Sequence, residues 1–215
     1  MTTVIAICGS MGSGKSTLVD YAKAALPDCV SLKEDDFHHT MERSLDDMDA
    51  WWQRGAEIAE FDLSLVAEQL SQLCPGRFEL DSSPEATAPA RKQSQRQSPA
   101  PEFVLFESQF GRLHPELLPW IDLQFWLDVP ADLAVVRKLL QFTTDLQRNS
   151  QTVNAADGLA WIAGFCGSYL TTTRKFFEMQ RTHVRSCSDR IIDGTGSPFE
   201  VCSRFLAGLP MNRSC

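Results

Sequence analysis

The stretch Gly9-Ser10-Met11-Gly12-Ser13-Gly14-Lys15-Ser16 decides the fold of this chain of 215 residues. It matches the pattern G-x-x-x-x-G-K-S/T in full. The apolar, β-branched run Thr3–Cys8 directly before it predicts a buried strand, and residues 16–26 directly after it predict a helix that Pro27 closes. A glycine-rich loop of this spacing between a strand and a helix is typical of proteins that bind nucleotide phosphates.

Each residue type in this loop has a physical role in phosphate binding. Glycines let the backbone curl until successive N–H groups point at phosphate oxygens, and the positive end of the following helix adds to the attraction. We expect Lys15 to reach the β- and γ-phosphates, and the Ser16 hydroxyl to coordinate Mg²⁺. The loop residues expected to bind ATP are Gly9, Ser10, Met11, Gly12, Ser13, Gly14, Lys15, Ser16 and Thr17.

Short apolar runs alternate with helical patterns along the rest of the chain. Further strands are expected over residues 29–32, 103–106, 121–129 and 190–193. Helices are expected over residues 44–53, 63–73, 131–142, 159–183 and 198–206, with Gly164 and Gly167 interrupting the longest of them. Because strands that alternate with helices form parallel sheets covered on both faces, the pattern predicts an α/β sandwich.

Two polar segments break the alternation. Residues 81–101 are rich in Ser, Pro, Ala and Gln and contain no large apolar side chain, so we expect a flexible loop there. Residues 143–154 are polar and are expected to be irregular.

The composition restricts partners and location. The net charge of −8 disfavours nucleic acid, because binding to a phosphate backbone needs a basic surface. No apolar run is long enough to cross a bilayer, and the N-terminus lacks the features of a secretion signal. We therefore expect a single cytoplasmic domain over residues 1–215, a monomer or homodimer that binds neither nucleic acid nor membrane.

The loop by itself does not separate kinases from GTPases or motor proteins. The guanine-reading motif N-K-x-D of GTPases does not occur in the sequence, and many other ATPases are longer. A short single domain favours a kinase that acts on a small molecule.

Such a kinase needs a carboxylate that orients the acceptor hydroxyl and takes its proton. Ligands of open parallel sheets bind at the carboxyl ends of the strands, so the candidates are the acids found there. The pair Asp35-Asp36 follows the second expected strand, and Glu107 ends the third. Adjacent residues seldom face the same way, so we expect only one of the two aspartates to point inward. Glu107, at the end of its strand, is expected to lie on the Mg²⁺ side.

Several short motifs together resemble one known family. The ordered pieces are GSMGSGKS, LPDCVSLKEDDF, AEFD, FVLFES and DGTGS. In this order they resemble the uridine kinase and phosphoribulokinase superfamily, and most closely the nicotinamide riboside kinases. The resemblance implies a P-loop NTPase three-layer sandwich with a five-stranded parallel sheet in the order 2-3-1-4-5 and a helical lid over about residues 137–160. It also implies ATP- and Mg²⁺-dependent phosphorylation of the 5′-hydroxyl of a nucleoside.

The resemblance also implies the roles of individual residues. Asp35, the first Asp before the Phe, matches the catalytic base, and Lys15 assists transfer. Ser16 and Glu107 match the pair on the Mg²⁺ side. Arg137 is the expected lid residue that contacts the phosphates of ATP.

Three more residues match the part of the family that binds the nucleoside. Asp62 matches an Asp that holds the ribose hydroxyls, and Phe61 matches an aromatic ring that stacks on the base. Phe37 is expected to form a wall of the same pocket. The family has Tyr at the position of Phe61 and more arginines in its lid. Uridine, pantothenate or a sugar therefore stays open as the acceptor, as does a nucleotide-binding protein without turnover.

Overall fold

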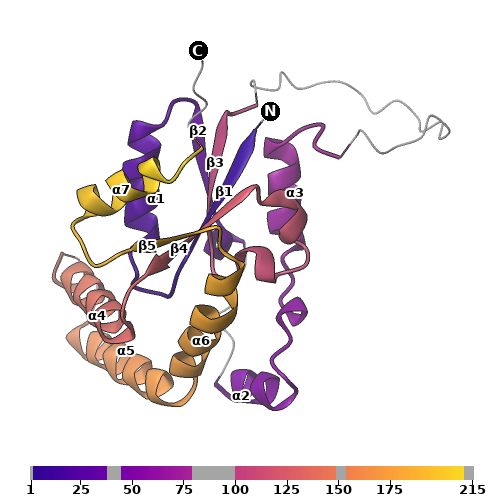
Figure 1. Cartoon of the computed structure of the whole chain (residues 1–215). Helices are drawn as coiled ribbons and strands as arrows, with labels where there is room; N and C mark the ends of the chain where they lie inside the picture. The colour runs from indigo at the N-terminus through magenta and orange to yellow at the C-terminus, as the bar shows by residue number, and fades with distance from the viewer. Residues whose placement is uncertain (1, 38–44, 79–99, 149–153, 211–215) are drawn as a thin grey trace.

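The computed structural model describes residues 2–37, 45–78, 100–148 and 154–210 of the chain (Figure 1). The strands are β1 (Thr3–Cys8), β2 (Cys29–Lys33), β3 (Phe103–Ser108), β4 (Leu123–Asp128) and β5 (Arg190–Asp193). The α-helices described are α1 (Lys15–Ala25), α2 (Leu45–Gln53), α3 (Ser64–Leu73), α4 (Ala131–Arg148), α5 (Ala155–Ser168), α6 (Arg174–Met179) and α7 (Pro198–Ala207). The π-helical segments η7 (Tyr169–Thr173) and η8 (Gln180–Val184) flank α6.

The strands form a five-stranded sheet in the order β2-β3-β1-β4-β5, and every neighbouring pair is parallel. This confirms the expected α/β fold class and strand order. Glu107 of β3 lies in register with Ile7 of β1 and Lys33 of β2. The carboxyl ends of these strands therefore meet at one edge of the sheet, and the loops that follow β1, β2 and β3 lie together there.

β1 is the central strand and contributes to both cores of the molecule. Val4, Ala6 and Cys8 pack with α2, α3 and α6, whereas Ile5 and Ile7 pack with α1 and α7. All five side chains are completely buried. Figure 1 shows α1 and α7 on one side of the sheet and α3 on the other. Because both faces are covered, β1 is a continuous apolar run rather than an alternating one.

α4 is longer than the sequence predicts. The expected irregular stretch over residues 143–154 is wrong for residues 143–148, which continue the helix to Arg148. The hydroxyls of Thr143 and Thr144 donate to the carbonyl oxygen of Leu140 at 3.0 and 2.7 Å. Since the helix itself supplies acceptors for these polar side chains, their presence does not end it.

α5 runs through Gly164 and Gly167 without the expected interruption. Its Trp161 stacks on Phe142 of α4, with ring centroids 3.6 Å apart, and lies 5.3 Å from the ring of Phe165. Each glycine inside a helix costs about 1 kcal/mol relative to alanine. Stacked aromatic rings offset that cost, because they join α5 to α4 along one face.

Some sequence predictions lie outside the described residues. These are most of the expected flexible loop, residues 81–99, and residues 149–153 of the expected lid. Within the described ranges, no helix combines the length and apolar character that a bilayer crossing requires.

Candidate functional site

The glycine-rich loop joins β1 to α1 and leaves the start of α1 open. Gly12 and Gly14 have φ angles of 79° and 97°, in the left-handed region that glycine adopts without strain. Gly14 is the N-cap of α1, and its position has no side-chain capping hydrogen bond. The first N–H groups of a helix lack acceptors within the helix, so this open end is suited to bind an anion.

Lys15 lies along the loop. Its Nζ donates to the carbonyl oxygen of Gly9 at 2.9 Å and approaches that of Ser10 at 3.4 Å. The residue is only 9% exposed. A buried ammonium needs acceptors or an anion, and here the loop carbonyls satisfy it. Positive charge is thereby held where the phosphates are expected.

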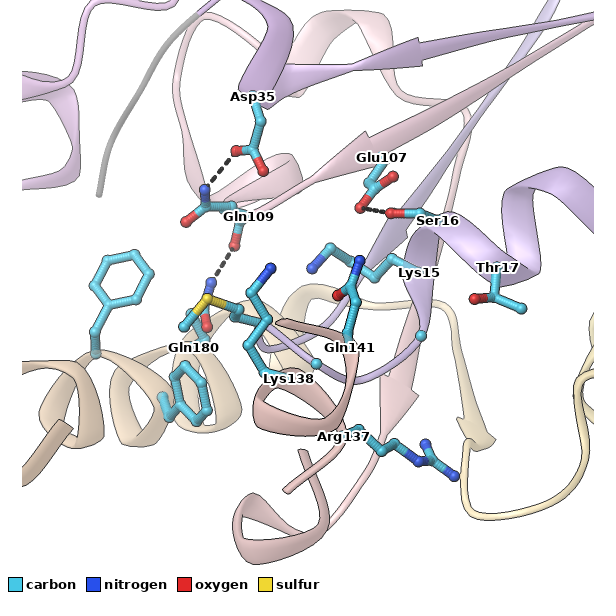
Figure 2. Close-up of a pocket in the computed structure, with 15 residues that line it drawn as sticks. Lys15, Ser16, Thr17, Asp35, Glu107, Gln109, Arg137, Lys138, Gln141 and Gln180 are labelled. Atoms are coloured by element: carbon cyan, nitrogen blue, oxygen red, sulfur yellow. Dashed lines mark hydrogen bonds between the residues drawn. The ribbon is translucent and has the colours of Figure 1, made fainter. Parts of the chain in front are cut away.

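A cavity of about 480 Å³ opens at the carboxyl edge of the sheet. Its walls come from the loop, the ends of β2 and β3, and the helices α4 and α6 (Figure 2). The predicted site residues that it brings together are Met11, Gly12, Gly14, Lys15, Ser16, Thr17, Asp35, Glu107 and Arg137. The edge position agrees with the general rule for open parallel sheets.

Ser16 and Glu107 lie side by side in this cavity. The Ser16 hydroxyl donates to Oε1 of Glu107 at 2.9 Å. Oε2 of Glu107 is buried and has no hydrogen-bond partner within the described part of the chain. Mg²⁺ prefers hard oxygen ligands and usually takes one or two carboxylates together with phosphate oxygens. An unpartnered carboxylate oxygen beside a hydroxyl fits that ion.

Asp35 is the member of the aspartate pair that lines the cavity. It lies on the 3₁₀ turn η1 (Glu34–Asp36), directly after β2. Its Oδ1 accepts a hydrogen bond from Nε2 of Gln109 at 2.7 Å, as Figure 2 shows. Asp36 is not among the residues lining the cavity. The turn thus separates the two adjacent carboxylates.

The cationic side chains of Arg137 and Lys138 on α4 point in different directions. Arg137 donates from Nη1 to the carbonyl oxygen of Gly194 at 2.9 Å, which ties α4 to the turn after β5. Lys138, the next residue on α4, also lines the cavity, and Figure 2 shows its ammonium directed inward. Successive helix residues point about 100° apart. Arg137 is the predicted phosphate contact, and the structure shows that Lys138 beside it lines the same cavity.

The residues predicted to hold the nucleoside do not line the cavity. Phe61 is completely buried, with its ring centroid 5.2 Å from that of Trp51 and 5.0 Å from that of Phe110. Phe37 packs against the same core. Asp62 accepts a hydrogen bond from the amide of Ser64 at 3.0 Å at the start of α3. A ring with no exposed surface offers no face to a ligand in this structure.

Some lining residues were not predicted from the sequence. Gln109 follows β3 directly, so the strand-end rule that selects Glu107 applies to it as well. Phe176, Phe177 and Gln180 come from α6 and η8. Their pattern in the sequence is that of an ordinary amphipathic helix. π-helical turns often occur at functional sites, but only the backbone of the folded chain reveals them.

Glu34 is a buried carboxylate next to the cavity. It is 1% exposed, and its Oε2 accepts hydrogen bonds from the Ser108 hydroxyl and from the amide of Gln109 at 3.0 Å. Burial raises the pKa of Glu34 to about 7, although these hydrogen bonds act in the opposite direction. The carboxylate therefore links the end of β2 to the end of β3 at a cost in solvation.

Glu34→Gln is expected to remove a pH-dependent loss of stability. The pKa of Glu34 is about 7 in the folded chain and 4.5 ordinarily, so unfolding releases a proton between these pH values. Rising pH then favours the unfolded chain, and the wild type loses up to about 3 kcal/mol relative to the variant over this window.

Denaturant unfolding at a series of pH values from about 4 to 8 measures this difference. The advantage of Glu34→Gln should grow as pH rises from about 4.5 to about 7 and stay constant above that. A difference that does not change with pH would contradict the assigned burial of charge.

Comparisons with known proteins give fold likenesses of low similarity. The sequence matches no protein-family model and no curated protein sequence. A shikimate kinase from Aquifex aeolicus is 15% identical, with a TM-score of 0.47 and coverage of 95% of this chain and 94% of that chain. A shikimate kinase from Acinetobacter baumannii in complex with shikimate is 15% identical (TM-score 0.49; coverage 96% and 92%). A sugar kinase from Janibacter sp. is 14% identical (TM-score 0.47; coverage 96% and 94%). Likenesses this distant support no conclusion about activity.

Proposed function

We propose that this protein is a kinase that uses ATP and Mg²⁺ to phosphorylate a hydroxyl group of a small molecule. One observation carries the proposal: Lys15, Asp35 and the hydrogen-bonded pair Ser16–Glu107 line the same cavity. Phosphoryl transfer to an alcohol needs a phosphate cradle, oxygen ligands for Mg²⁺ and a proton acceptor within reach of each other.

In the proposed reaction, Lys15 and the loop N–H groups hold the β- and γ-phosphates of ATP. Ser16 and Glu107 would hold Mg²⁺, which supplies positive charge to the phosphates when bound. Asp35 takes the proton of the acceptor hydroxyl while the oxygen of that hydroxyl attacks the γ-phosphorus. The new O–P bond forms as the bond from the γ-phosphorus to the bridging oxygen breaks, and ADP leaves.

A second cavity supports the placement of the adenosine end of ATP. It has a volume of about 210 Å³ and lies beside the loop, between α1 and the turn after β5. Leu127 and Val201 contribute apolar surface, and Arg137 lines this cavity as well as the larger one. A planar heterocycle would pack against this apolar part of the lining, and the shared Arg137 would lie between base and phosphates.

The proposed lid covers about residues 137–160, and its described residues lie mainly in α4 and α5. Phe142, Trp161 and Phe165 form one aromatic stack between the two helices. The contact between Phe142 and Trp161 joins α4 to α5, so we propose that the two helices move together. Closure would bring Lys138 toward the phosphates and exclude water from the transfer.

Nicotinamide riboside is the first acceptor to test, because the order of the sequence motifs resembles nicotinamide riboside kinases. Since Phe61 and Asp62 lie outside the cavity lining, the polar side chains proposed to face an acceptor are Asp35, Gln109, Lys138 and Gln141. Uridine, pantothenate and simple sugars form the comparison set.

The test is a screen for acceptor-dependent ADP release with mass analysis of the products. One acceptor should yield one phosphorylated product per ADP, and removal of Mg²⁺ with a chelator should stop the reaction. Ser16→Ala should raise the Mg²⁺ concentration needed for half-maximal rate, since it removes the hydroxyl oxygen proposed to bind the ion. Ser203→Ala on the exposed side of α7 is the matched control. If ATP binds but no acceptor raises ADP release, the protein binds nucleotides without turnover.

A further inference from the structure

We infer that Gln109 is a positioning residue that orients the carboxylate of Asp35 toward the acceptor hydroxyl, an inference that rests on the proposed phosphoryl transfer. Asp35 belongs to a three-residue turn and its side chain is exposed. A carboxylate on an exposed turn samples several rotamers, and only some of them face the acceptor. A proton acceptor displaced by about 1 Å costs up to about a hundredfold in rate, so such a residue needs a partner that holds it.

The side chain of Gln109 is that partner. Its Nε2 donates to Oδ1 of Asp35 at 2.7 Å, the distance of a strong, charge-assisted hydrogen bond. Only one orientation of the amide suits this contact, because the opposite one would set its carbonyl oxygen against a carboxylate oxygen. With Oδ1 held in this way, Oδ2 is the atom that remains for the acceptor, and Figure 2 shows it on the cavity side of Asp35.

The backbone of Gln109 is held from two directions. Its amide donates to Oε2 of Glu34 at 3.0 Å, and its carbonyl oxygen accepts from Nε2 of Gln180 at 3.1 Å. Glu34 and Gln180 are each 1% exposed, so water does not compete for these bonds. Gln109 is thereby anchored to the turn that carries Asp35 and to the helix across the cavity.

This network gives Asp35 a defined position without touching the phosphate loop. The groups involved come from η1, the end of β3 and the start of η8. None of the three hydrogen bonds includes a residue of the loop at 9–16. Loss of the Gln109 amide should therefore lower kcat for transfer and leave the affinity for ATP unchanged.

The test is a double-mutant cycle on kcat with the best acceptor. Gln109→Met keeps the length of the side chain and removes the donor, and should lower kcat by about tenfold to a hundredfold, with KM for ATP changed by less than about twofold. In an Asp35→Asn background the same change should alter kcat by less than about twofold, because a residue that acts through Asp35 has nothing left to position. Gln72→Met, at an exposed site on α3, is the chemical control.

Gln109→Asn is the second variant, because it keeps the amide and the backbone bonds but withdraws the donor by one methylene. Gln109→Asn should also lower kcat, and it replaces Gln109→Met in the test if that variant does not fold. Full kcat in either folded variant, or losses that multiply in the double mutant, would overturn the inference. Wild-type protein with no acceptor-dependent turnover would instead refute the proposed function, so the two failures are distinct.

Discussion

Asp35→Asn is expected to lower acceptor phosphorylation by about 10²- to 10⁴-fold, the usual contribution of a general base. Asparagine has the shape of aspartate, and its Oδ1 can still accept the hydrogen bond that Gln109 donates at 2.7 Å. The variant therefore keeps the position of the side chain and loses only its ability to take a proton. ATP binding should stay within about twofold of wild type, since the loop and Lys15 form a separate set of contacts.

Single-turnover measurements with saturating ATP, together with an ATP titration, check this expectation. Asp36→Asn is the matched control, because Asp36 is adjacent, exposed and not among the residues lining the cavity. It should retain near-normal turnover. If Asp35→Asn transferred phosphate at a rate close to wild type, another group would have to be the proton acceptor.

Gly12→Ala is expected to weaken ATP binding by at least about tenfold, or about 1.4 kcal/mol of binding free energy. Gly12 has a φ of +79°, where an L side chain costs about 1–2 kcal/mol. An added Cβ would also lie 2.0 Å from the carbonyl oxygen of Ala134 and 2.8 Å from its carbonyl carbon. Both are backbone atoms of α4, so no side-chain rotation relieves the contact. Either the phosphate loop or the start of α4 must move.

Calorimetric ATP titration measures the loss of ATP affinity, and thermal unfolding measures the effect of the contact on stability. Gly164→Ala is the control, because a Cβ at Gly164 meets no heavy atom within 4 Å. Alanine is the better helix former by about 1 kcal/mol, so Gly164→Ala should raise Tm slightly and leave ATP affinity unchanged. Wild-type ATP affinity in Gly12→Ala would show that the loop does not need its close approach to α4.

Much of the fold could be predicted because its signals are local. Thr3–Cys8 is buried on both faces of the sheet, and a continuous apolar run predicts such a strand. The glycine loop has a conformation that few sequences allow, so its pattern predicted where a phosphate site would lie. Two predictions made from local composition were wrong, the irregular stretch at 143–148 and the interruption of the helix at Gly164 and Gly167. Hydrogen bonds within α4 and aromatic stacking between α4 and α5 outweigh local polarity and glycine propensity there.

The candidate site likewise has features that the sequence predicts and features that depend on the folded chain. The sequence by itself determined the glycine-rich loop, the strand that precedes it and the acids near the carboxyl ends of β2 and β3, because each depends on neighbours a few residues away. Only the tertiary structure decided which of these side chains meet. It directed Asp35 into the cavity and buried Phe61 against Trp51. It also brought Gln109 to Asp35 across 74 positions of the chain. Contacts of this kind depend on which faces of distant elements pack together, and no local pattern in the sequence carries that information.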